Sequence, residues 1–111
     1  LTFRKLNSRD YFFRNGQVCR YVAFVQSGLV RMFTITDTKE ITVDLISENT
    51  FVTDYGSFLT STPSEVSIEA LEPTELWLLS HEKMQWLYQH LPQGEKLGRL
   101  VAERLYLQAG E

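Results

Sequence analysis

The chain has 111 residues, of which 43% are hydrophobic and 23% charged, a composition that suits one folded domain and excludes a disordered chain. Its 11 Lys and Arg residues against 14 Asp and Glu residues leave a net charge of −3, without the basic surplus typical of a nucleic-acid-binding surface. The single cysteine, Cys19, excludes an internal disulfide and a cysteine-rich zinc site, and a lone thiol fits a cytoplasmic location. No apolar run approaches the roughly 20 residues of a membrane-spanning helix, so we expect no membrane partner.

Residues 1–79 predict a mainly β domain, because short runs rich in β-branched and aromatic residues alternate with turn signals. The turn signals include Asn15-Gly16, which is typical of a hairpin, and Ser27-Gly28. The predicted strands comprise residues 1–6, 11–13, 21–25, 29–36, 40–45, 66–70 and 76–79. Short strands at this spacing indicate a sandwich or a barrel.

Two of these strands also carry a prediction about burial. Residues 21–25 are continuously apolar, as expected for a strand that is covered on both faces. In residues 40–45, Ile41, Val43 and Leu45 alternate with polar residues. This period of two predicts a strand with one buried face and one solvated face.

A helical period replaces the strand pattern at Ser80, which is a good N-cap, and Glu82 places a favourable negative charge in the first turn. Pro92 ends this predicted helix of residues 80–91. A second helix is predicted from about residue 93 to 108. Its apolar positions, three or four residues apart, are Leu97, Leu100, Val101 and Leu105. From the pattern alone, this stripe either packs on its own domain or pairs with a second copy of the chain.

The segment of residues 48–65, ENTFVTDYGSFLTSTPSE, is predicted to be a loop and is the unusual region of the chain. It combines an acid, aromatic residues, a glycine and many hydroxyl side chains, which suits a binding loop on a rigid scaffold as well as a plain connection. It contains no glycine-rich phosphate-binding motif. Gly56 with its neighbouring hydroxyl groups could form only a small anion site.

The chain offers little for metal binding or nucleophilic catalysis. His81 and His90 are nine residues apart on the first predicted helix, which places them on opposite faces. Arg20 could lower the pKa of Cys19, but no histidine lies near this cysteine in the sequence, and a buried structural cysteine is the better interpretation. We therefore expect no enzyme activity, no metal and no cofactor.

The order of these segments resembles the sensor domain of the Crp–Fnr superfamily of bacterial transcription regulators. Residues 14–30 are similar to the pattern G-x-x-x-x-x-x-x-F-x-x-x-G-x-V that opens this domain, with Gly16, Phe24, Gly28 and Val30 in place. Residues 69–76, 80–91 and 94–108 resemble the strand after the phosphate-binding cassette, the helix that follows and the start of the dimerisation helix. The resemblance covers nearly the whole chain and implies an eight-stranded antiparallel jelly roll, or double-stranded β-helix, with C-terminal α-helices.

The ligand motif of the family is altered in this chain. Members that bind cyclic AMP carry a Glu that contacts the ribose and, ten residues later, an Arg that neutralises the cyclic phosphate, followed by Ser or Thr. Here the resemblance places Asp54, Ser64 and Glu65 at these three positions. Because Ser cannot replace the bidentate contacts of Arg with phosphate, we expect no tight binding of a cyclic nucleotide. The candidate ligand-binding residues are Thr53, Asp54, Tyr55, Gly56, Ser57, Ser64, Glu65 and Val66.

The resemblance implies an effector-sensing and dimerising domain of a cytoplasmic regulator, with an effector of unknown identity. Residues 1–91 would form the jelly roll with its following helix, and residues 92–111 the start of a helix that forms a homodimer. DNA would be read by a helix-turn-helix in residues that follow Glu111 in a longer protein. Two alternatives remain, namely a cyclic-nucleotide-binding regulatory module of a channel or kinase, and a cupin-like jelly-roll enzyme.

Overall fold

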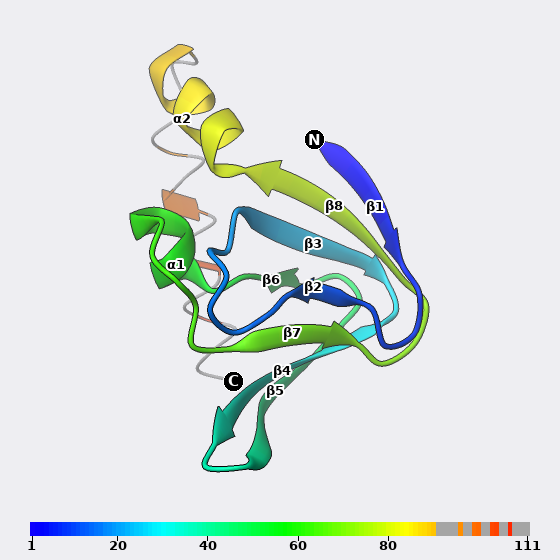
Figure 1. The fold of residues 1–111 in the computed structure, drawn as a ribbon. Helices are drawn as coiled ribbons and strands as arrows, with labels where there is room; N and C mark the ends of the chain where they lie inside the picture. The colour runs from blue at the N-terminus through cyan, green and yellow to red at the C-terminus, as the bar shows by residue number, and fades with distance from the viewer. Residues whose placement is uncertain (91–95, 97–98, 101–102, 105–106, 108–111) are drawn as a thin grey trace.

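The computed structural model describes residues 1–90, 96, 99–100, 103–104 and 107. The described residues form eight strands and two helices, in the order β1 (Thr2–Leu6), β2 (Tyr11–Phe13), β3 (Tyr21–Ser27), β4 (Leu29–Thr36), β5 (Lys39–Ser47), β6 (Phe51–Val52), α1 (Tyr55–Thr60), β7 (Ser67–Ala70), β8 (Thr74–Ser80) and α2 (His81–His90). The strands form two four-stranded antiparallel sheets with the orders β1-β8-β3-β6 and β2-β7-β4-β5 (Figure 1). The predicted mainly β jelly roll is confirmed.

The core lies between the inward faces of the two sheets. In the first sheet, Val25 of β3 is paired with Leu76 of β8, and in the second, Val30 of β4 is paired with Ala70 of β7. All four side chains are completely buried. Because a fully buried Val or Leu side chain contributes about 1.5–3 kcal/mol, these pairs hold the sheets face to face.

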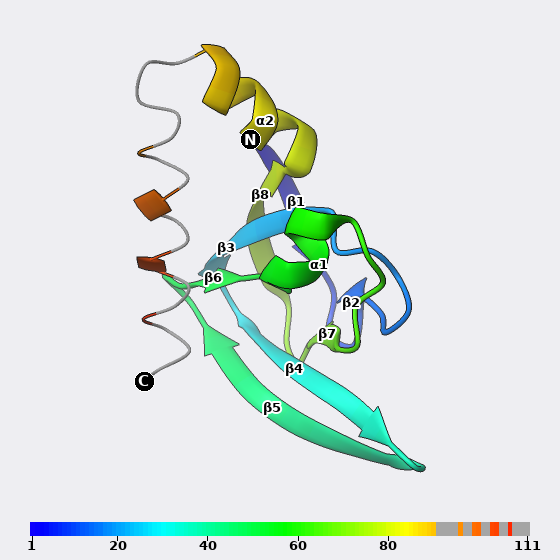
Figure 2. The same ribbon diagram turned by 90° about the vertical axis from the view of Figure 1, so that its left-hand side faces the viewer.

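The β4–β5 hairpin contradicts the prediction of one buried face for residues 40–45. Ile41, Val43 and Leu45 are 47%, 52% and 58% exposed, and Figure 2 shows the hairpin extending beyond the other strands. The register shifts between Met32 and Phe33, whose partners are Asp44 and Thr42, so Val43 is an extra residue in β5. A β-bulge of this kind reverses the alternation, and it places Ile41 and Leu45 on opposite faces of the sheet.

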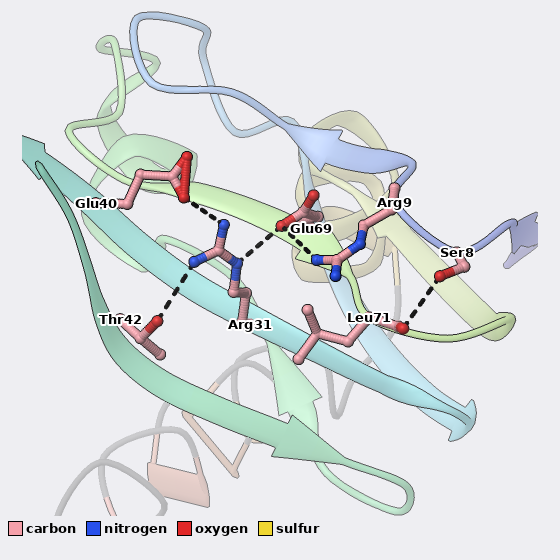
Figure 3. A network of polar contacts seen from close by, with 7 residues as sticks. All are labelled: Ser8, Arg9, Arg31, Glu40, Thr42, Glu69 and Leu71. Atoms are coloured by element: carbon pink, nitrogen blue, oxygen red, sulfur yellow. Dashed lines mark hydrogen bonds and ion pairs between the residues drawn. The ribbon is translucent and has the colours of Figure 1, made fainter.

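An ion-pair network joins this hairpin to the rest of its sheet (Figure 3). The Arg31 guanidinium donates to Glu69 of β7 at 2.8 Å and to Glu40 of β5 at 2.6 Å. Arg9 approaches the same Glu69 carboxylate at 3.8 Å. Glu69 is 6% exposed, and the hydrogen bonds that the Arg31 guanidinium donates to Glu40 and Glu69 raise the pKa of Arg31. The hairpin is thereby fixed by charge in a region where apolar burial is small.

The predicted loop of residues 48–65 contains a strand and a helix that were not predicted from the sequence. β6 pairs with β3, and α1 forms a short helix of six residues. Asp54 is the N-cap of α1, and its Oδ1 accepts a hydrogen bond from the Ser57 N–H at 3.3 Å. Ser61 ends α1 in the left-handed conformation with φ of 55°.

The predicted start of the following helix is confirmed, because Ser80 Oγ accepts a hydrogen bond from the Lys83 N–H at 3.0 Å and α2 begins at His81. The second predicted helix falls largely outside the described residues, as do Leu97, Val101 and Leu105 of its stripe. Leu100 is described and is 50% exposed. Within the part of the chain that the structure describes, no helix has the length and apolar character needed to cross a membrane.

Candidate functional site

A cleft of about 550 Å³ lies beside α1, between the segments that enter and leave this helix and strand β4. It is lined by Met32, Thr53, Asp54, Tyr55, Gly56, Ser57, Thr60, Thr62, Pro63, Glu65 and Val66. Seven of the eight candidate ligand-binding residues are in this lining. Met32 of the distant strand β4 also lines the cleft, as do Thr60, Thr62 and Pro63, and these four residues were not among the predicted site residues.

The exception is Ser64, which lies behind the surface of the cleft. Its side chain is 2% exposed, and Ser64 Oγ donates a hydrogen bond to Asp54 Oδ2 at 2.6 Å. The Val66 N–H in turn donates to Ser64 Oγ at 3.1 Å. Asp54 and Ser64, the residues at the Glu and Arg positions of the family motif, are therefore each other's hydrogen-bond partners. Ser64 presents no hydroxyl to a molecule in the cleft.

Asp54 consequently has two structural roles. One carboxylate oxygen caps α1 at the Ser57 N–H, and the other accepts the hydrogen bond from Ser64. Hydrogen bonds to a carboxylate are charge-assisted and stronger than neutral ones. Asp54 joins the start of α1 to the segment between α1 and β7, and this contact fixes the shape of the cleft.

Two other hydroxyl residues of the segment, Thr53 and Ser57, anchor it to the core. Ser57 Oγ accepts from the Cys19 N–H at 2.8 Å and donates to the Thr62 carbonyl at 2.5 Å. Thr53 Oγ1 donates to the Tyr21 carbonyl at 2.9 Å and lies 3.3 Å from Cys19 Sγ. Thr53 and Ser57 are 8% and 4% exposed. Their hydroxyl groups thus satisfy buried backbone groups, as buried polar groups generally must.

Cys19 itself is buried, as expected for a structural cysteine, with an exposed fraction of 1%. Burial raises the pKa of its thiol, although the hydrogen bond between this thiol and Thr53 opposes the shift. A protonated and inaccessible thiol is a poor nucleophile.

Tyr55 and Phe58 connect α1 to α2. Their rings stack with centroids 6.0 Å apart, and Phe58 meets the His81 ring edge-on at 5.3 Å. Burial raises the pKa of Tyr55, and the nearby Tyr88 phenol adds to the shift. His90 lies at the other end of α2 and stacks on Trp86 at 4.6 Å, so the two histidines occupy separate aromatic contacts.

The charges around the cleft are negative. Asp54 and Glu65 are the ionisable acids in the lining, and no Lys, Arg or His side chain is among the described residues that line it. Glu65 is exposed, and its carbonyl accepts from Asn15 Nδ2 at 2.9 Å and from Thr34 Oγ1 at 3.1 Å. An entering phosphate would meet repulsion without a compensating cation. Among the described residues, no group of three His, Cys, Asp or Glu side chains could hold a metal ion.

Comparison with known proteins identifies the family. The cyclic nucleotide-binding domain family matches residues 3–90, which is most of the chain, and the chain therefore belongs to this family. No curated protein matches the chain by sequence.

Three solved structures illustrate the range of proteins that share this fold. The catabolite activator protein of Thermus thermophilus is 28% identical over 96% of this chain and 51% of its own, with a TM-score of 0.78. CLP of Xanthomonas campestris, a c-di-GMP-responsive global regulator, is 25% identical over 95% of this chain and 52% of its own, with a TM-score of 0.79. The cAMP-bound regulatory domain of Toxoplasma gondii PKA is 18% identical over 76% of this chain and 32% of its own, with a TM-score of 0.69. The chain spans about half the length of the first two proteins.

Proposed function

We propose that this chain is the effector-sensing and dimerising domain of a Crp–Fnr-type transcription regulator whose cassette does not bind cyclic AMP or cyclic GMP tightly. The family membership supports a sensor domain. The identity of 25–28% with two bacterial regulators favours a transcription regulator over a channel or kinase as the protein that contains this domain, since the PKA regulatory domain is similar in fold alone.

The hydrogen bond between Ser64 and Asp54 carries the ligand part of the proposal. The position where the family resemblance implies a phosphate-binding Arg holds a buried Ser whose hydroxyl is already used inside the protein. A hydrogen bond to a charged group contributes about 1.5–3 kcal/mol, and loss of at least one such bond corresponds to roughly 10- to 100-fold in affinity. Glu65 at the next position weakens anion binding further.

Isothermal titration with cyclic AMP and cyclic GMP tests this part directly. We expect no binding at micromolar ligand, and micromolar affinity would contradict the proposal. The double substitution Ser64→Arg with Glu65→Ser should create measurable affinity for cyclic nucleotides, while Glu65→Ser alone should not. If the double variant folds and still gains no affinity, then the cleft has diverged beyond these two positions, and its effector need not resemble a nucleotide.

The regulatory part of the proposal predicts two further properties. The reading frame of the parent gene should encode a helix-turn-helix after residue 111. The protein should form a homodimer through the stripe that contains Leu100, which is half-exposed in one copy. Leu100→Glu should therefore lower the mass measured by analytical ultracentrifugation, whereas a wild-type protein that is monomeric at high concentration would contradict dimerisation by this segment.

A further inference from the structure

The outward face of the sheet β1-β8-β3-β6 is apolar. Phe24 of β3 is paired with Trp77 of β8 on one side and with Phe51 of β6 on the other. Val22 of β3 is paired with Leu79 of β8. These two residues lie two positions from Phe24 and Trp77 along their strands, and so they share this face. Residues 21–25 were predicted to be covered on both faces, and on this outward face Val22 is buried and Phe24 is half-buried. Trp77 of the neighbouring strand remains 38% exposed. The described residues of the chain do not bury this face completely.

Helix α2 turns the apolar face into a groove. A hollow of about 630 Å³ is lined by Leu1, Val22, Phe24, Phe51, Trp77, Leu79, Lys83 and Leu87, the last two from α2. Ligand sites in proteins are mostly apolar hollows of about 300–1,000 Å³ with a few polar groups that orient the ligand. The groove shares no lining residue with the cleft beside α1.

Lys83 is the one charged residue among the described residues of this lining. It is exposed, and its Nζ lies 4.7 Å from the centre of the Trp86 ring. In the described part of the chain, no carboxylate lies within 4.0 Å of this ammonium group. A cation on a flexible stem is therefore available at the side of an apolar hollow, where it complements an anionic group attached to an apolar body.

We propose that this groove binds an unbranched aliphatic monocarboxylate of medium chain length, with the chain against Phe24 and Trp77 and the carboxylate on Lys83. A second copy of the protein fits less well, because a stable interface buries about 800 Å² per partner over a broad face, whereas this apolar surface is recessed between a sheet and a helix. The site is separate from the cleft of the proposed function, so its failure would leave that proposal intact.

Titration of the full chain with decanoate below its micelle concentration, followed by tryptophan fluorescence and calorimetry, tests the site. Trp77 in the groove and Trp86 beside Lys83 provide the signal. We expect saturable binding that strengthens about 15-fold from octanoate to decanoate, since each buried CH2 contributes about fourfold. Decan-1-ol should bind more weakly than decanoate. The absence of saturable binding would overturn the proposal.

Charge substitutions at Lys83 separate specific binding from simple partition of a chain onto an apolar surface. Lys83→Gln should weaken decanoate binding up to about fivefold, and Lys83→Glu should reverse the preference so that decylamine binds better than decanoate. Lys39→Gln, at the start of β5, is the matched control and should change nothing. Equal affinity in all variants would overturn the assignment. So would a decanoate-induced fall in sedimentation mass, which would assign the groove to a second copy.

Discussion

The hydrogen bond between Asp54 and Ser64 can be measured by a double-mutant cycle with Asp54→Ala and Ser64→Ala. Asp54→Ala removes the cap of α1, which costs about 1 kcal/mol, and the charge-assisted bond from Ser64. A hydrogen bond to a charged group contributes about 1.5–3 kcal/mol, and we use about 1.5 kcal/mol here because the Ser64 hydroxyl can donate instead to the Val66 carbonyl, 3.1 Å away. The free energy of unfolding should therefore fall by about 2.5 kcal/mol, which corresponds to a fall in Tm of about 10–20 °C.

Urea denaturation followed by circular dichroism gives the four free energies of the cycle. We expect Ser64→Ala to cost about 2 kcal/mol, because the Val66 N–H loses its acceptor as well, and the two substitutions to couple by about 1–1.5 kcal/mol. Asp54→Asn is the matched control, since Asn caps a helix as well as Asp and can accept from Ser64. If the single effects add to within about 0.3 kcal/mol, the two side chains do not hold each other, and the reasoning about the closed cassette is refuted.

Three further predictions concern the scaffold. Gly28→Ala should lower the free energy of unfolding, measured by urea denaturation, by about 3–5 kcal/mol, because φ is 108° and an added Cβ would lie 2.7 Å from the Cα of Thr74. Gly16→Ala is the matched control and should cost only about 1–2 kcal/mol, because φ is 91° but an added Cβ would meet no atom within 4 Å. Glu69→Gln should lower the free energy of unfolding by about 2 kcal/mol. This is less than the loss expected for a fully buried ion pair, because Arg31 keeps its contact with Glu40, and a loss below about 0.5 kcal/mol would contradict the prediction. Because burial raises the pKa of Cys19, its contribution to stability is complete below the unfolded pKa of 9.0 and is lost as pH rises above it; this part of the alkaline slope should vanish in Cys19→Ala.

Much of the fold could be predicted because its signals are local. Residues 29–36 were predicted as a strand and form β4 with the same bounds. Gly16 follows Asn15 at a turn and has a positive φ, although β2 and β3 lie in different sheets and this turn does not close the predicted hairpin. The hydroxyl of Ser80 caps α2 as its position before an apolar helical period predicts. In each case, neighbouring residues along the chain supply both the signal and the physical cause.

The candidate site was predictable as a segment but not as an arrangement. The unusual composition of residues 48–65 and the family resemblance located the cleft, yet α1 was missed because it is too short for a helical period to appear in the sequence. The pairing of Asp54 with Ser64 joins residues ten positions apart that meet only when the chain turns back after α1. The buried position of Ser64 reverses its expected role, from lining the cleft to supporting it.

The sequence by itself determined most of the segments that become strands, several of their turns and most of the residues that line the cleft, because propensity, turn chemistry and capping act over a few residues. Tertiary structure alone decided which way the side chains of β5 point, since one extra residue opposite the Met32–Phe33 step reverses every position beyond it. It also decided that the apolar outward faces of β3 and β8 form a groove beside α2, because only the packing of distant elements determines which apolar surface is covered.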